Sequence, residues 1–137
     1  MTPEKIALVK NSWQQVLPIK DTAAQLFYGQ LFELDPSLRS MFKGEMVEQG
    51  RKLMAMINTV VSSLDNLGPI LGRIEELGRG HVAYGVTAAH YDTVGNALLW
   101  TLGQGLGEQF TPAVKDAWTD AYSTLSSAMK NAAYAAA

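Results

Sequence analysis

Hydrophobic residues recur at intervals of three and four along most of the chain, which is the spacing of one face of an α-helix. The segment 46–66 shows the pattern with Leu53, Ile57, Val60 and Leu64. Sustained alternation and Asn-Gly turns, which would indicate strands, are missing from the sequence. The predicted helices span 3–17, 20–34, a short turn at 36–42, 46–66, 69–83, 91–106 and 111–133. The pattern therefore predicts an all-α protein.

The five prolines mark where these helices begin. Proline fits the first turn of a helix because its missing N–H needs no partner there. Thr2-Pro3 and Thr111-Pro112 each place a capping hydroxyl directly before such a proline. Pro18, Pro36 and Pro69 separate neighbouring apolar segments. The segments are too many and too uneven for a regular four-helix bundle, so a less regular packing of six to seven helices is expected.

Length and composition predict a single domain. The chain has 137 residues, of which 47% are hydrophobic and 18% are charged, so it can build one core and is not disordered. No internal repeat or linker interrupts residues 1–137. The alanine-rich tail 132–137 either extends the last helix, frays from it or is foreign to the native chain.

Charge and cysteine content exclude several classes of function. The net charge is −2 and no basic patch stands out, so we expect no nucleic-acid partner. No apolar run is long enough to span a bilayer and no basic amphipathic stretch suggests a membrane surface. The absence of cysteine excludes disulfides, thiolate catalysis and iron–sulfur clusters. The N-terminus lacks the apolar core of a signal peptide, so a cytoplasmic protein is expected.

His81 is the main candidate for chemistry. It follows Ile70, Ile74 and Leu77 at helical spacing, at the end of an apolar stripe. A neutral imidazole there could hold a transition metal or a haem iron, or it could be a core histidine with a satisfied hydrogen bond. The stripe by itself favours the core histidine. The other histidine, His90, has no such stripe and is the weaker candidate ligand.

The helix that carries His81 is rich in glycine. Gly72, Gly78 and Gly80 each cost on the order of 1 kcal/mol relative to alanine inside a helix. Tertiary contacts or a ligand must therefore hold this segment in place.

Motifs spread along the whole chain resemble those of the globins, in particular single-domain bacterial haemoglobins and the globin domain of flavohaemoglobins. The interval of 32 residues from Gln49 to His81 resembles the distal-to-proximal interval of that family. The residues that carry the resemblance are Trp13, Phe27-Tyr28, Phe42, Gln49, Arg51-Lys52-Leu53, Leu77-Gly78-Arg79, His81, Tyr84-Gly85-Val86, His90-Tyr91, Val94-Gly95, Ala117-Trp118 and Tyr122. The resemblance implies a globin fold around one b-type haem, and it favours His81 as a ligand.

The resemblance also implies a role for each site residue. His81 is the metal ligand on the proximal side, with its Nδ1–H donating to a carbonyl one turn back, that of Leu77. Tyr28 and Gln49 are the distal pair that stabilises a bound gas. The implied haem contacts are Phe42, which packs on the haem face, Leu53, which forms an apolar lid, Lys52 or Arg51, which meets a propionate, Tyr91, which lies under His81, and Leu77, Val86 and Val94.

Simpler explanations exist for several of these residues. Phe42 and Leu53 would be core residues in any helical protein, and Arg51 and Lys52 fit a solvated helix face. Ala24 and Gly50 are small enough to let their two helices cross closely, which is a matter of packing. The chain also departs from the flavohaemoglobin pattern on the proximal side, because Ala133 falls where that family has a glutamate.

The function that the resemblance implies is reversible oxygen binding at a five-coordinate iron. Carbon monoxide and nitric oxide are further expected ligands. Two hydrogen-bond donors over the iron favour slow oxygen release, since each such bond to a charged acceptor contributes roughly 1.5–3 kcal/mol. We therefore expect a contribution to nitric oxide detoxification with an external reductase. The alternatives are oxygen storage, gas sensing without turnover, and a haem-free helical interaction module.

Overall fold

Helices make up almost all of the protein. The computed structural model describes residues 2–42, 44–83 and 86–134, without the side chains of residues 82, 83, 133 and 134. Across these residues the α-helices are α1 (Pro3–Val16), α2 (Lys20–Leu34), α3 (Met46–Ser62), α4 (Leu71–Ala83), α5 (Ala88–Leu106) and α6 (Pro112–Tyr134). Short 3₁₀ turns join them at Leu17–Ile19, Pro36–Met41, Gly68–Ile70 and Gly107–Gln109. The all-α prediction is confirmed.

The helix starts follow the predicted capping chemistry. The Thr2 side chain accepts a hydrogen bond from the Lys5 N–H at 3.2 Å, and Pro3 is the first residue of α1. At α6, the Thr111 hydroxyl oxygen accepts from the Val114 N–H at 3.3 Å. These bonds satisfy N–H groups that the first helical turn leaves without partners.

Three predicted boundaries are wrong by a few residues. The segment predicted at 46–66 ends as a helix at Ser62, where the chain turns and the Asn66 N–H bonds to the Ser63 carbonyl at 2.9 Å. The segment predicted from 69 starts as a 3₁₀ turn and becomes α4 at Leu71. The segment predicted from 91 begins at Ala88. The first turn of α5 begins with two small alanines and His90, which add no large apolar side chain to the pattern, so this start was placed too late.

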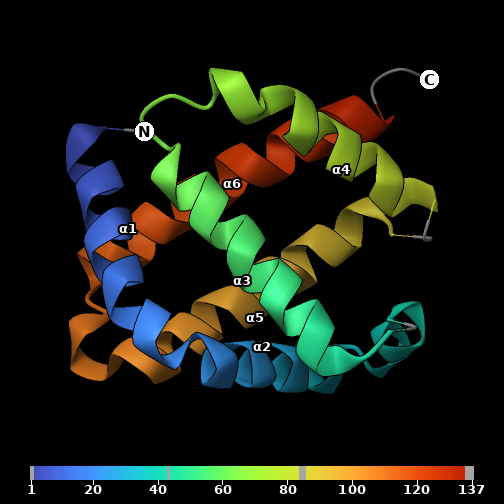
Figure 1. Ribbon diagram of the computed structural model, residues 1–137, viewed down its shortest axis with the longest axis horizontal. Coiled ribbons are helices and arrows are strands. Elements are labelled where there is room, and N and C mark those ends of the chain that lie inside the picture. Colours follow the sequence, from blue (N-terminus) through green and yellow to red (C-terminus); the bar gives the residue numbers. More distant parts are fainter. Residues whose placement is uncertain (1, 43, 84–85, 135–137) are drawn as a thin grey trace.

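The main core lies where α1, α3, α5 and α6 meet (Figure 1). Trp13 and Trp118 pack edge to face with their ring centroids 6.0 Å apart. Both indole N–H groups have partners: Trp13 donates to the Asn58 side-chain oxygen at 3.0 Å and Trp118 to the Ser12 hydroxyl at 2.8 Å. These buried rings tie the first and last helices together.

Small residues set two close helix crossings. A methyl group added at Gly50 of α3 would lie 2.9 Å from the Cβ of Ala24 of α2, so the expected crossing of these two helices is present. A Cβ at Gly78 of α4 would lie 2.5 Å from the carbonyl oxygen of Met129 of α6. In contrast, α3 and α4 make little direct contact through their described residues. None of the helices in the described ranges is long and apolar enough to cross a membrane.

Candidate functional site

His81 lies in the last turn of α4 and is half-buried. Burial lowers the pKa of its imidazole below the usual 6.5, so the ring is neutral at pH 7 and has a lone pair to offer. Its Nδ1 lies 3.4 Å from the Tyr91 hydroxyl oxygen. We expected this nitrogen to donate to the Leu77 carbonyl. Within the described residues its partner is Tyr91 instead, because α5 brings that phenol ring against the imidazole.

The position of α4 follows from its apolar stripe and its contact with α6. Ile74 is 2% exposed and packs with Tyr91 and Met129 in a small core of their own. Gly78 allows the backbone of α6 to come close, as described above. The predicted weakness of this helix is thus offset by packing at one of its glycines. At Gly72 and Gly80 no such close neighbour occurs among the described atoms.

A second cluster forms on the other side of the candidate site. Tyr28 of α2 is buried and lies with Phe42, Leu53 and Val94 in one apolar group. The rings of Tyr28 and Phe42 meet edge to face with centroids 5.3 Å apart. The Tyr28 hydroxyl lies 3.4 Å from the main-chain carbonyl oxygen of Gln49. Burial raises the pKa of Tyr28 to about 12, so its hydroxyl keeps its proton and remains a donor.

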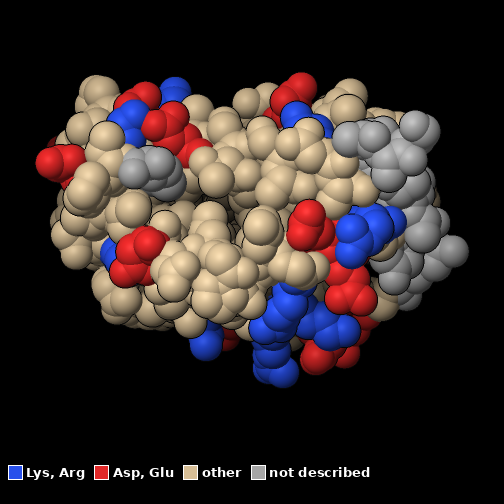
Figure 2. All heavy atoms as spheres, turned by 90° about the horizontal axis from the view of Figure 1, so that it is seen from above, with Lys and Arg blue, Asp and Glu red and all other residues tan. Residues whose placement is uncertain are grey.

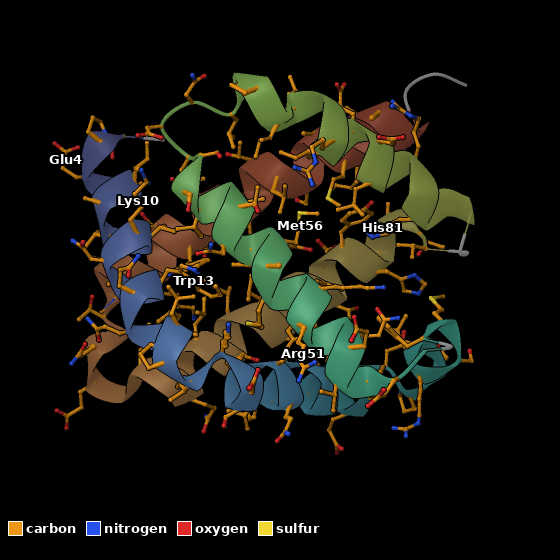
Figure 3. All side chains as sticks on the ribbon, in the orientation of Figure 1. Glu4, Lys10, Trp13, Arg51, Met56 and His81 are labelled. Carbon is orange, nitrogen blue, oxygen red and sulfur yellow. The ribbon has the colours of Figure 1, made fainter. Side chains whose placement is uncertain are left out.

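The face of α3 that carries Gln49 and Leu53 continues to Met56, three residues further on. Figure 3 shows Met56 and His81 projecting toward the region between α3 and α4. Gln49 and Met56 are both half-buried. Sequence reasoning missed Met56, although its spacing after Leu53 was a usable signal.

The side chains around this region suit a flat apolar group. Phe42, Leu53, Leu77, Val86 and Val94 are all apolar, yet each keeps part of its surface accessible. The rest of the protein does not bury these five side chains fully, although each of them belongs to a packed cluster. The neutral imidazole of His81 comes from α4, and the protonated phenol of Tyr28 comes from α2. This combination fits a haem, which needs an apolar lining, one nitrogen ligand and polar groups near its open face.

The donor set around His81 does not fit a metal ion held by protein side chains alone. No cluster of three or more histidine, cysteine or carboxylate side chains occurs in the described part of the chain. A free transition-metal ion usually takes at least three such ligands, whereas a porphyrin supplies four nitrogens and needs one protein ligand.

The two basic residues predicted near a propionate are both exposed. Arg51 and Lys52 both lie on the solvent-exposed face of α3. No described contact brings either of them to His81 or Tyr28, so the propionate contact stays a prediction.

His90 has a structural role at the start of α5. Its Nδ1 accepts a hydrogen bond from the Thr87 N–H at 3.0 Å, and its Nε2 lies 3.9 Å from a carboxylate oxygen of Asp35. One ring nitrogen is thus already in use as an acceptor. This favours His81 over His90 as the ligand.

Tyr91 has polar neighbours that the sequence did not reveal. The Tyr122 hydroxyl donates to the Tyr91 carbonyl at 2.6 Å, and burial raises the pKa of Tyr122. The Lys130 Nζ lies 5.9 Å from the centre of the Tyr91 ring. The side chain of Ala133, where the resemblance places a missing glutamate, lies outside the described residues. On the face in Figure 2, charges of both signs are interspersed and no broad area of one sign appears.

Comparison with known proteins gives consistent matches over most of the chain. The family model described as Globin matches residues 25–129. Neuroglobin from Danio rerio is 32% identical over 136 residues, covering 89% of this chain and 86% of that protein. Neuroglobin from Chaenocephalus aceratus is also 32% identical over 136 residues, with the same two coverages.

A solved structure shares the fold. It is an engineered carbene transferase, RmaNOD, a candidate nitric oxide dioxygenase from Rhodothermus marinus. It superimposes with a TM-score of 0.89 at 24% sequence identity, covering 99% of this chain and 95% of that one.

Proposed function

The chain belongs to the globin family, and from that premise we propose that it binds one b-type haem without covalent attachment, with His81 as the axial ligand. The observation that carries the proposal is the neutral, half-buried imidazole beside Tyr91. The residues proposed to contact the haem are Phe42, Lys52, Leu53, Leu77, Val86, Tyr91 and Val94. Haem supplies reversible binding of diatomic gases and a one-electron redox couple.

The remaining site residues hold and polarise the gas. We propose Tyr28 and Gln49 as hydrogen-bond donors over a five-coordinate iron. The Tyr28 ring is already packed against Phe42, so only its O–H, which donates to the Gln49 carbonyl oxygen at 3.4 Å, has to turn toward the gas. Oxygen gains more from such donors than carbon monoxide, since it carries more negative charge when it binds ferrous haem. Leu53 excludes water from the same face. These features support slow oxygen release.

We further propose a contribution to nitric oxide detoxification. One nitric oxide and one oxygen molecule combine, with uptake of one electron, to give one nitrate, and the electron comes from a separate reductase. The name of the structurally similar protein from Rhodothermus marinus supports this choice. The alternative is oxygen storage or gas sensing without turnover, which slow release supports equally. Nitric oxide consumption that continues while a reductase is supplied favours detoxification. Consumption that stops after one equivalent even with the reductase present favours the alternative.

The haem ligand can be tested by two matched substitutions. His81→Ala should abolish stable haem binding, or leave a weakly bound haem that added imidazole restores, because the iron loses its nitrogen ligand. His90→Ala should bind haem with the native Soret spectrum. The measurement is a haem titration of each purified apoprotein. Loss of haem in His90→Ala with retention in His81→Ala would reverse the assignment.

A further inference from the structure

A lysine lies beside the tyrosine that contacts His81. The tight crossing of Gly78 with the backbone of Met129 presses this part of α6 against α4. Lys130 follows directly, and its Nζ lies 5.9 Å from the centre of the Tyr91 ring, within the range of a cation–π interaction. The close approach at Met129 sets where the backbone of Lys130 lies relative to α4.

Tyr91 connects this charge to the proposed iron ligand. The Tyr91 side chain is only 5% exposed, and its hydroxyl lies 3.4 Å from the His81 Nδ1. The contact of Lys130 with the Tyr91 ring and the contact of the Tyr91 hydroxyl with Nδ1 therefore connect the ammonium group to the imidazole. Within the described residues no carboxylate pairs with Lys130, so an ion pair does not neutralise its charge there.

The charge has the same effect through two routes. A histidine that binds iron through Nε2 keeps its proton on Nδ1 and donates it to Tyr91. A cation next to Tyr91 makes the phenol oxygen a poorer acceptor, so the imidazole gains less negative character and gives less electron density to the iron. The cation also repels the extra positive charge of ferric iron directly. Both routes favour the ferrous state.

We propose that Lys130 is a positioning residue that acts through Tyr91 to hold the haem iron in its ferrous, gas-binding state. This inference rests on the proposed haem site. It assigns a cation to the side of the haem where the flavohaemoglobin pattern has an acid. Haem iron held in this way can be reduced by a weaker reductant, and it stays in the oxygen-binding ferrous state for longer.

The test compares the Fe(III)/Fe(II) reduction potentials of haem-loaded proteins. Lys130→Gln should shift the potential downward, Lys130→Glu should shift it further down, and Lys130→Arg should leave it close to the original value. The control is Lys115→Gln, which removes the same charge from an exposed site on α6, about 22 Å away along the helix axis. The potential of the control should not change.

A second readout separates the charge from any structural role. The iron–histidine stretching frequency in resonance Raman spectra should rise in Lys130→Gln and Lys130→Glu, because the imidazole becomes a stronger donor. Equal potentials in all variants, or an equal shift in the Lys115 control, would overturn the inference and leave the proposed function standing. Failure of the unmodified protein to bind haem would overturn both.

Discussion

Burial sets the protonation states of His81 and Tyr28, the two titratable side chains with the main proposed roles in the candidate site. His81 is held neutral and Tyr28 is held protonated. Neither state requires a charged partner, because loss of solvation alone disfavours the imidazolium and the phenolate. The candidate site can therefore offer a lone pair from His81 and a hydrogen-bond donor from Tyr28 at neutral pH.

Removal of one distal donor should speed the release of oxygen. Tyr28→Phe deletes a hydroxyl and keeps the ring contacts with Phe42, so oxygen dissociation should become faster by ~10-fold or more. Gln49→Leu should act in the same direction. The two effects should not add, because both donors serve the same ligand. Stopped-flow release that is unchanged in both variants would contradict the roles given to this pair.

His81 should make the apoprotein less stable in acid. Its pKa in the folded protein lies below the unfolded value of 6.5, so the unfolded chain takes up a proton first as the pH falls. The contribution of neutral His81 is complete above pH 6.5 and is lost as the pH falls through the folded pKa. Urea unfolding from pH 8 to pH 5 should show this decline, and His81→Gln should flatten it. An equal loss of stability in both proteins would show that a group other than His81 causes it.

The crossing of α4 and α6 holds the helix that carries His81. Only a residue without a side chain fits at Gly78, where a Cβ would lie 2.5 Å from a carbonyl oxygen. Leu77 and Ile74 complete the contact from the same helix. The glycine thus lowers the intrinsic helix propensity of α4 and at the same time permits its main tertiary contact.

Alanine at two glycines of α4 should have opposite effects on stability. Gly78→Ala should lower the free energy of unfolding of the apoprotein by ~1–3 kcal/mol, because the backbone of α6 has to move away. Gly72→Ala meets no described atom within 4 Å and should raise it by up to ~1 kcal/mol. Urea titrations of the two variants measure both values. Similar stabilities would mean that the crossing is looser than described.

The sequence predicted the elements better than their edges. Apolar spacing and the prolines located all six long helices, since both signals are local. The apolar pattern did not predict the start of α5, because the contact between Thr87 and His90 that caps this helix involves polar groups. The apolar pattern also did not distinguish the 3₁₀ turn before α4 from the helix that follows, because both share the same spacing.

At the level of the whole molecule, the candidate site is assembled from two separate apolar clusters. Tyr28, Phe42 and Val94 belong to one, and Leu77 and Tyr91 to the other. The helix α3 contributes Leu53 to the first cluster, and α4, which packs on α6 (Figure 1), contributes Leu77 to the second. The apolar and aromatic residues predicted for the site fall into these two groups, whereas Gln49, Lys52 and His81 belong to neither.

Family resemblance carried most of the site prediction, and geometry supplied the rest. His81 and its apolar stripe were readable from spacing alone, but the choice between ligand and core residue was not. The contacts of Tyr91 with His81 and Lys130 depend on how α4, α5 and α6 cross, which local patterns do not encode. The exposed positions of Arg51 and Lys52 likewise follow from the rotation of α3.

The central claim is that this globin holds a five-coordinate haem iron on His81 and binds oxygen reversibly. The most direct test is the visible spectrum of the haem-loaded ferrous protein, recorded without oxygen, with oxygen and again after oxygen is removed. We predict a five-coordinate, high-spin spectrum that oxygen converts to a six-coordinate, low-spin one and that returns when the gas is removed. A six-coordinate, low-spin spectrum in the absence of any gas, or immediate oxidation by oxygen, would contradict the account.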